Sequence, residues 1–168
     1  EEFVNRMNRE YIAFWSSGRE KEADKLKLTK IEVVTLASII DQESLYDDEN
    51  RTIAGVFINR IRQKIPLQSD PTIIFAHQDF TMKRVLNKHK TIDSPYNTYK
   101  HRGLPPGPIC IPSISAIDAV LNYEQHKYLY FCAKPDFSGY HNFASTLSQH
   151  NKNARSYQRA LDQRKIYK

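Results

Sequence analysis

All but one of the prolines in this 168-residue chain lie between residues 66 and 112. Proline fixes φ at about −65° and has no N–H group, so neither a long helix nor a central strand can run through this segment. We expect one short helix here, with Asp70 as its N-cap and Pro71 as its first helical residue. Seven aromatic or histidine residues from Phe75 to His101 argue against disorder. The segment is therefore interpreted as a long, loop-rich wall of a cleft.

On both sides of this segment, apolar residues recur at the spacing of helices and strands. Thr29 and Glu32 match the capping-box pattern at the start of a helix, whereas residues 19–28 are so charged that we interpret them as a connector. The expected elements are helices over residues 2–17, from Thr29 to about Leu45, from the acidic residues 47–49 to Pro66, from Ser113 to Leu121 and from about Thr146 onward, and strands over Tyr128–Ala133 and Tyr140–Ala144. These patterns predict an α+β fold, one mainly helical domain over residues 1–168 with a small antiparallel hairpin.

Composition excludes several classes of function. The chain has 25 Lys or Arg against 19 Asp or Glu, a net charge of +6 and a pI of about 9.3, which favours an anionic partner without identifying it. The sequence has no GxGxxG or GxxxxGK[ST] loop, which excludes the common dinucleotide and P-loop sites. Its basic clusters come without an RNP-like motif, zinc finger or basic-region heptad, so we expect no nucleic-acid partner. The longest apolar runs are too short to predict a membrane span.

The cysteines and histidines lack the spacing of a metal site. Cys110 and Cys132 form no CxxC pair and are interpreted as buried thiols, although the sequence leaves open whether they are bonded. The histidines include no HExxH motif, and no serine has the context of a nucleophile elbow. We therefore expect no metal, no cofactor and no catalytic triad.

Glu43 is the acidic residue that stands out on the helix beginning at residue 29. At about 100° per residue, Val33, Leu36 and Ile40 share one apolar stripe, and Glu43 extends it. If this end of the helix faces a partly dry cleft, desolvation raises the pKa of the carboxyl group, as a general acid working near neutral pH requires. Periodicity alone leaves open the alternative of a helix-end glutamate turned to solvent.

Other acidic residues are sparse along the presumed cleft. Asp41 projects to the other side of its helix, and residues 47–49 are interpreted as caps of the next helix. Between residues 66 and 120 the acids are Asp70, Asp79, Asp93 and Asp118. Asp70 is the candidate for the second carboxylate of a glycosidase site, although its expected N-cap role competes with this. His141 and Phe143 share one face of a predicted strand, and such polar and aromatic groups are typical of carbohydrate clefts.

Seven ordered sequence blocks resemble a known family. They are Ala37-Ser-Ile-Ile-Asp-Gln-Glu43, Gly55-Val-Phe-Ile-Asn-Arg60, Leu67-Gln-Ser-Asp-Pro-Thr72, Tyr96-Asn-Thr-Tyr99, Gly103-Leu-Pro-Pro-Gly-Pro108, Tyr128-Leu-Tyr-Phe131, and His141-Asn-Phe143 with His150-Asn151. In their order and separations they are similar to the endolytic murein transglycosylases of the YceG-like, or MltG, family, and the resemblance covers residues 30–165. The family's first acidic residue in the first block is commonly Glu, where this chain has Asp41.

The resemblance implies an enzyme that cuts peptidoglycan strands internally, between N-acetylmuramic acid and N-acetylglucosamine, and leaves a 1,6-anhydromuramoyl end. Glu43 matches the family's catalytic glutamate. One carboxyl group suffices, because it protonates the glycosidic oxygen and then, as a base, deprotonates the C6 hydroxyl that attacks the anomeric carbon. The residues that the blocks imply for holding the sugars are Gln68, Asp70, Thr72, Tyr96, Asn97, Thr98, Tyr99, His141, Phe143, His150 and Asn151.

The resemblance also implies a larger protein of the cell envelope. In the family, a membrane anchor and a small LysM-like region precede the catalytic domain, and neither is recognisable in this chain. The catalytic domain then lies on the outer, periplasmic side of the cytoplasmic membrane, with peptidoglycan strands as substrate and peptidoglycan synthases as candidate partners. The alternative function is a module that binds peptidoglycan without cutting it.

Overall fold

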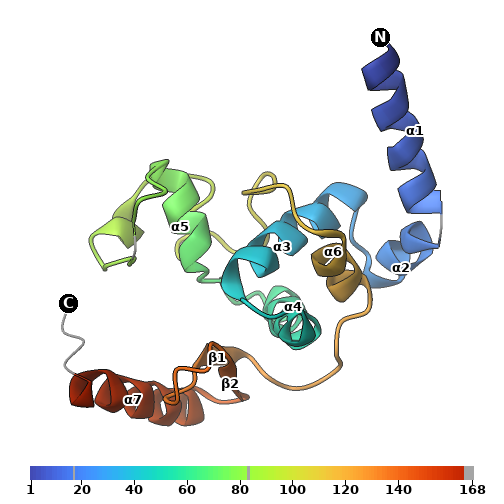
Figure 1. The fold of residues 1–168 in the computed structure, drawn as a ribbon. Coiled ribbons are helices and arrows are strands. Elements are labelled where there is room, and N and C mark those ends of the chain that lie inside the picture. The colour runs from blue at the N-terminus through green and yellow to red at the C-terminus, as the bar shows by residue number, and fades with distance from the viewer. Residues whose placement is uncertain (17, 83, 165–168) are drawn as a thin grey trace.

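The computed structural model describes residues 1–16, 18–82 and 84–164 (Figure 1). The last residue of the first predicted helix, Ser17, lies outside the described residues, as do Lys83 and the end of the basic C-terminal segment, residues 165–168. Figure 1 shows a helical centre, a loop-rich segment on one side, and a hairpin with a long helix on another. The α+β class and its small antiparallel hairpin are therefore confirmed.

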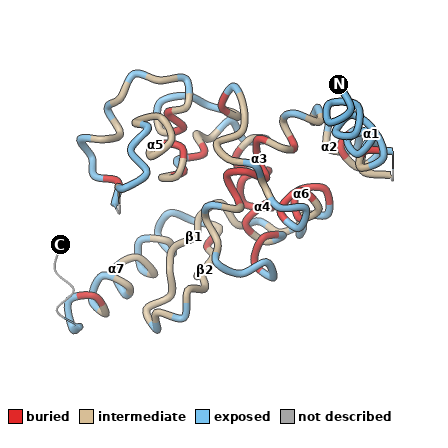
Figure 2. Tube along the Cα trace, turned by 45° about the horizontal axis from the view of Figure 1, so that its top comes forward, coloured by how far each residue is buried: buried red, intermediate tan, exposed pale blue. Residues whose placement is uncertain are grey.

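The centre consists of α3 (Lys30–Glu43), α4 (Asp47–Arg62) and α6 (Ile114–Leu121). These helices carry most of the buried residues, drawn red in Figure 2. The predicted stripe of Val33, Leu36 and Ile40 is fully buried, so the core fixes the orientation of α3. The capping box is confirmed as well, because the Thr29 N–H donates to the Glu32 carboxylate at 2.8 Å and the Glu32 N–H donates to Thr29 Oγ1 at 3.3 Å.

The N-terminal region contains two helices, α1 (Glu2–Ser16) and α2 (Arg19–Leu26). The prediction of α1 is confirmed, although only Trp15 of its residues is buried and the helix projects away from the body (Figure 1). The prediction of a connector over residues 19–28 is wrong. A two-point ion pair from Arg19 to Asp118 of α6, at 2.7 and 3.0 Å, holds α2 in place, together with Ala23 in the core and Leu26 packed against it.

The proline-rich segment is mostly loop, with α5 (Asp70–His77) and a short 3₁₀ turn η1 (His89–Thr91) as its helical parts. Ser69 is the N-cap of α5, so the prediction of Asp70 as N-cap and Pro71 as first helical residue is wrong by one position. The side chain of Asp70 is engaged elsewhere, in the cleft described below. Asn97 organises the loop, because its buried side-chain amide donates to the carbonyl oxygens of residues 90 and 92 at 2.9 and 2.8 Å.

The hairpin is formed by β1 (Tyr130–Ala133) and β2 (His141–Ala144), with Phe131 opposite Phe143, and it packs against α7 (Leu147–Gln163). The prediction of two strands is confirmed, and β1 begins two residues later than expected.

The interpretation of the acidic residues 47–49 as caps is wrong. The N-cap of α4 is Tyr46, which makes no side-chain capping bond, and the three acids lie in the first turn, where the helix dipole favours them. Glu49 instead accepts hydrogen bonds from the backbone N–H and Nδ1 of His141, at 3.0 and 2.8 Å. The start of α4 thereby holds the hairpin.

Cys110 and Cys132 are both free thiols and are half-buried. Within residues 1–16, 18–82 and 84–164 there is no helix of the length and apolarity that a membrane crossing requires. The same residues contain no group of three or more His, Cys, Asp or Glu side chains placed to hold a metal ion.

Candidate active site

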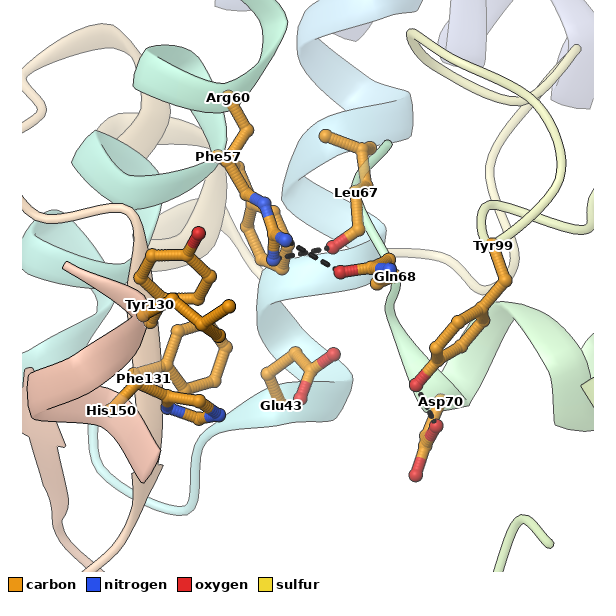
Figure 3. Close-up of a pocket in the computed structure, with 11 residues that line it drawn as sticks. Glu43, Phe57, Arg60, Leu67, Gln68, Asp70, Tyr99, Tyr130, Phe131 and His150 are labelled. Carbon is orange, nitrogen blue, oxygen red and sulfur yellow. Dashed lines mark hydrogen bonds between the residues drawn. The ribbon is translucent and has the colours of Figure 1, made fainter. Parts of the chain in front are cut away.

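A cavity of about 370 Å³ opens where the C-terminal end of α3 faces the start of α5 and the hairpin (Figure 3). It is lined by Glu43, Phe57, Arg60, Leu67, Gln68, Asp70, Tyr99, Tyr130, Phe131, Leu147 and His150. These residues come from α3, α4, the proline-rich segment, β1 and α7. Of the residues singled out in the sequence, the cavity brings together Glu43, Gln68, Asp70, Tyr99 and His150.

Glu43 is the last residue of α3, and its carboxyl group reaches the cavity from the end of the buried stripe (Figure 3). Burial raises the pKa of Glu43 from an ordinary 4.5 to about 7, helped by the nearby charge of Asp70 and opposed by a hydrogen bond from Ser69. The Ser69 Oγ donates to Oε1 of Glu43 at 2.5 Å. A carboxyl group with this pKa is substantially protonated near neutral pH and can donate a proton there.

Below this contact lies a cluster of buried hydroxyl groups from Ser69, Thr72 and Thr98, which are at most 2% exposed. The Ser69 N–H donates to Thr98 Oγ1 at 3.0 Å, and Thr72 Oγ1 donates to the Ser69 carbonyl oxygen at 2.8 Å. The two threonine hydroxyls are themselves 2.8 Å apart. Thr72 and Thr98, predicted to hold sugar, therefore lie beneath the cleft and make their hydrogen bonds inside the protein.

Arg60 forms the floor of the cavity and is only 7% exposed. Its Nη1 donates to the Leu67 carbonyl oxygen at 3.1 Å and its Nη2 to Gln68 Oε1 at 2.7 Å (Figure 3). Gln68 has a left-handed φ of 56°, an uncommon conformation for a residue with a side chain. The guanidinium group thus holds the turn that leads into Ser69.

One wall carries Asp70 and Tyr99. The Tyr99 hydroxyl donates to Asp70 Oδ1 at 2.5 Å, and Lys90 Nζ lies 3.9 Å from the same oxygen and 4.2 Å from the centre of the Tyr99 ring. Burial and the adjacent Asp70 raise the pKa of Tyr99 far above its usual range. Tyr99 therefore stays protonated well above neutral pH and can donate its hydrogen bond to Asp70 there.

The opposite wall is aromatic and belongs to the hairpin and α7 (Figure 3). Tyr130 stacks on His150 with 5.3 Å between ring centroids, and Phe131 meets Phe57 edge-on at 5.8 Å. Burial, followed by the charge of Arg60, lowers the pKa of His150, which favours its neutral form at pH 7. Flat rings beside polar groups suit the binding of sugars, which present apolar faces and hydroxyl edges.

The other predicted site residues lie outside the cavity lining. Asn97 is buried in its loop, and Tyr96 packs on Phe75 with ring centroids 4.7 Å apart. His141 is paired with Glu49, and Phe143 stacks on Tyr128 at 5.6 Å. Asn151 is exposed on α7.

Sequence reasoning missed several lining residues. Arg60 had a usable signal, because it continues the apolar face of Ile53, Val56 and Phe57 on α4 at helical spacing. A cation in that position indicates a buried partner or a cavity. Ser69, which lies beneath the lining, belongs to a family block, but nothing in the sequence indicates its contact with Glu43, which is 26 residues away.

Comparisons with known proteins identify relatives of this chain. A family model described as the YceG-like family matches residues 1–156. An endolytic murein transglycosylase of Bacillus subtilis (strain 168) is 43% identical over 141 residues, which is 82% of this chain and 38% of that protein. One from Streptococcus pneumoniae (serotype 2, strain D39) is 32% identical over 157 residues, which is 91% of this chain and 27% of that protein.

A solved structure also matches the fold. The crystal structure of a yceG-like protein from Listeria monocytogenes has a TM-score of 0.73 and 38% sequence identity, covering 81% of this chain and 43% of that chain. The chain spans between 27% and 38% of the length of the curated relatives described above.

Proposed function

Because the chain belongs to the YceG-like family, we propose that it cuts peptidoglycan strands internally as a lytic transglycosylase. The observation that carries this proposal is Glu43, a carboxyl group with a pKa of about 7 that reaches a cavity with one aromatic and one polar wall. The relatives' name, endolytic murein transglycosylase, supports the class of substrate.

The first step is acid catalysis. Protonated Glu43 donates its proton to the oxygen that links C1 of N-acetylmuramic acid to the next N-acetylglucosamine, and the bond from C1 to this oxygen breaks. The departing sugar keeps the oxygen as a hydroxyl group. The muramic acid ring is left with positive charge shared between C1 and the ring oxygen, as in other glycoside cleavages.

The second step reverses the role of the same group. The Glu43 carboxylate takes the proton from the C6 hydroxyl of the muramic acid residue, and the C6 oxygen bonds to C1 to form the 1,6-anhydro ring. Glu43 regains its proton, and no water is consumed. The chemistry therefore needs neither a covalent enzyme intermediate nor a second carboxyl group to activate water.

The remaining lining residues take supporting parts in this proposal. Asp70 lies on the polar wall of the cavity and would stabilise positive charge on the ring, while the Tyr99 hydroxyl keeps it in place. Tyr130 and His150 would stack against a sugar face, and Gln68 would bind hydroxyl groups.

We propose a place in the cell envelope for the same reason, since peptidoglycan lies there. A membrane anchor and LysM-like region elsewhere in the full protein, and peptidoglycan synthases as partners, remain predictions from the family resemblance.

Digestion of purified sacculi tests the proposed function. The chain should release soluble fragments, and Glu43→Gln should release none although it folds. Glu10→Gln makes the same chemical change at an exposed residue of α1 and should match the unaltered chain. If Glu43→Gln releases fragments at the same rate, Glu43 is not the acid. If the unaltered chain binds sacculi without shortening any strand, the alternative of a non-cleaving binding module holds.

A further inference from the structure

The carboxyl group of Glu43 has a single hydrogen-bond partner within the described part of the chain, the hydroxyl group of Ser69. Ser69 is 1% exposed, so it is too deeply buried to touch a sugar in the cavity. Ser69 therefore acts on the reaction through the groups that it contacts, and Glu43 is the one of these that lines the cavity.

Ser69 also departs from the usual behaviour of a serine at its position. It is the N-cap of α5, where a serine hydroxyl normally accepts a hydrogen bond from a backbone N–H of the first turn. Here the hydroxyl makes no capping bond and donates to Glu43 instead. The first turn of the helix therefore lacks a side-chain cap, and the hydroxyl group is directed at the carboxyl group of Glu43.

We propose that Ser69 is a positioning residue for Glu43, whose hydroxyl holds Oε1 so that the transferable proton resides on Oε2. The catalytic use of this proton rests on the proposed function, whereas the contact between Ser69 and Glu43 does not. A carboxyl oxygen that accepts a hydrogen bond from Ser69 is the carbonyl-like oxygen of the protonated group. The other oxygen then carries the proton and is left to meet the glycosidic oxygen.

The backbone of Ser69 is held from both sides, which fixes the position from which its hydroxyl group reaches Glu43. Thr98 Oγ1 accepts from the Ser69 N–H, and Thr72 Oγ1 donates to the Ser69 carbonyl oxygen. Just before Ser69, Arg60 holds Leu67 and Gln68 from the cavity floor. The threonines therefore act on Glu43 through Ser69, which explains why these polar residues are buried beneath the cleft.

The contact also tunes the proton affinity of Glu43. The hydroxyl stabilises the ionised carboxylate and so lowers its pKa, while burial raises it by a larger amount. The balance places the pKa of Glu43 near neutral pH, where a group can serve first as acid and then as base.

The test compares Ser69→Ala with Ser69→Thr, which keeps a hydroxyl group. In Ser69→Ala we expect the pKa of Glu43, followed by NMR of ¹³C-labelled glutamate, to rise by about one unit. We expect kcat to fall about 10- to 100-fold with KM little changed, because the carboxyl group is misplaced while the sugar contacts remain. Ser69→Thr should restore the pKa and most of kcat.

The outcomes separate this proposal from the proposed function. An unchanged pKa of Glu43 in Ser69→Ala, or a rise in KM at unchanged kcat, overturns the positioning role even if the unaltered chain cuts sacculi. A raised pKa in Ser69→Ala supports the positioning contact even if the chain cuts nothing, in which case the proposed function fails. If Ser69→Ala does not fold, Thr98→Val, which removes the acceptor of the Ser69 N–H, should raise the same pKa by a smaller amount, and no change there overturns the proposal.

Discussion

The burial of Glu43 suits it to donate a proton and also makes its ionised form unfavourable for the folded protein. Its backbone belongs to a helix whose apolar stripe is fully buried, and its carboxyl group continues that stripe into a cavity. The cavity holds the carboxyl group where its ionised form is disfavoured. The property that suits a proton donor therefore lowers the stability of the folded protein once the group ionises.

The pH dependence of unfolding tests this cost. A carboxyl group whose pKa is raised by folding binds its proton more tightly in the folded state, so stability falls as pH rises from about 4.5 to about 7. We expect the free energy of unfolding to lose up to about 3 kcal/mol through Glu43 over this range. Glu43→Gln cannot ionise, so its urea-unfolding curve at pH 8 should show higher stability than that of the unaltered chain. Equal stability of the two at pH 8 would contradict the burial of an ionised Glu43.

Asp70 provides a prediction of opposite sign to that for Ser69. Its negative charge raises the pKa of Glu43, so Asp70→Asn should lower that pKa and move the alkaline limb of the pH–rate profile to lower pH. It should also reduce kcat, because the developing positive charge loses a stabilising partner. Asp93→Asn makes the same change at an exposed residue of the same segment and should leave the profile in place. A profile for Asp70→Asn that shifts to higher pH would be inconsistent with this geometry.

At the scale of elements, the hairpin forms the aromatic wall of the cavity, and contacts with the start of α4 help to hold it in position. Tyr46, just before α4, stacks on Tyr140 with 4.3 Å between ring centroids and donates to the Ser138 carbonyl oxygen at 3.0 Å. The turn between the strands passes through Gly139, which has a φ of 87°. A Cβ atom there would lie 3.0 Å from Tyr46 Cε2 and 3.3 Å from Leu45 Cδ1.

Two glycine substitutions distinguish the effect of backbone strain from the effect of a clash with Tyr46. Gly103 also has a left-handed φ, of 83°, but a Cβ there would meet no heavy atom within 4 Å. Gly103→Ala should therefore lower the free energy of unfolding by about 1–2 kcal/mol through strain alone. Gly139→Ala should lower it further and should raise KM, because the displaced hairpin carries Tyr130 and Phe131. The two variants are compared by urea unfolding and steady-state kinetics, and equal effects would show that the contact with Tyr46 is unimportant.

Element by element, the sequence predicts those parts of the fold in which local chemistry and burial agree. The capping box at Thr29 and the apolar stripe of α3 define that helix before any tertiary contact is known. By contrast, α2 has only Ala23 and Leu26 as an apolar face, and it is also held by the pairing of Arg19 with Asp118, 99 residues away. The cap of α5 is misassigned for a similar reason, because Tyr99 engages the side chain of Asp70 and Glu43 engages that of Ser69.

On the scale of the whole molecule, the candidate site is a meeting of segments that are distant in sequence. Glu43 can be singled out because it extends the apolar stripe of its own helix with a carboxyl group. The scarcity of acids along the cleft indicates Asp70 and the family blocks indicate Tyr99 and His150, but only the folded chain brings them to one cavity. Thr72 and Thr98 show a limit of inferring roles from family blocks. A block indicates that a residue belongs to the site, but it does not indicate whether the residue contacts a ligand or supports a neighbouring residue.

The positive net charge of the whole chain predicts that its binding to peptidoglycan depends on salt. With a net charge of +6, attraction to the carboxylates of peptidoglycan stem peptides should aid docking and be screened by salt. The exposed side of α7, beside the cavity, carries Lys152, Arg155 and Arg159. We expect KM for sacculi to rise several-fold between about 50 and 500 mM salt while kcat changes little. A KM that is independent of salt would show that electrostatic attraction does not contribute to the binding of sacculi.

The mass of the cleavage product tests the central claim most directly. If Glu43 serves as acid and then as base, each new muramic acid end closes on its own C6 oxygen and is lighter by one water than a hydrolysed end. Mass spectrometry of fragments released from sacculi should show these anhydro ends with the unaltered chain and none with Glu43→Gln. Reducing muramic acid ends at the full mass would contradict the account, because they require an activated water that the single-carboxyl mechanism does not use.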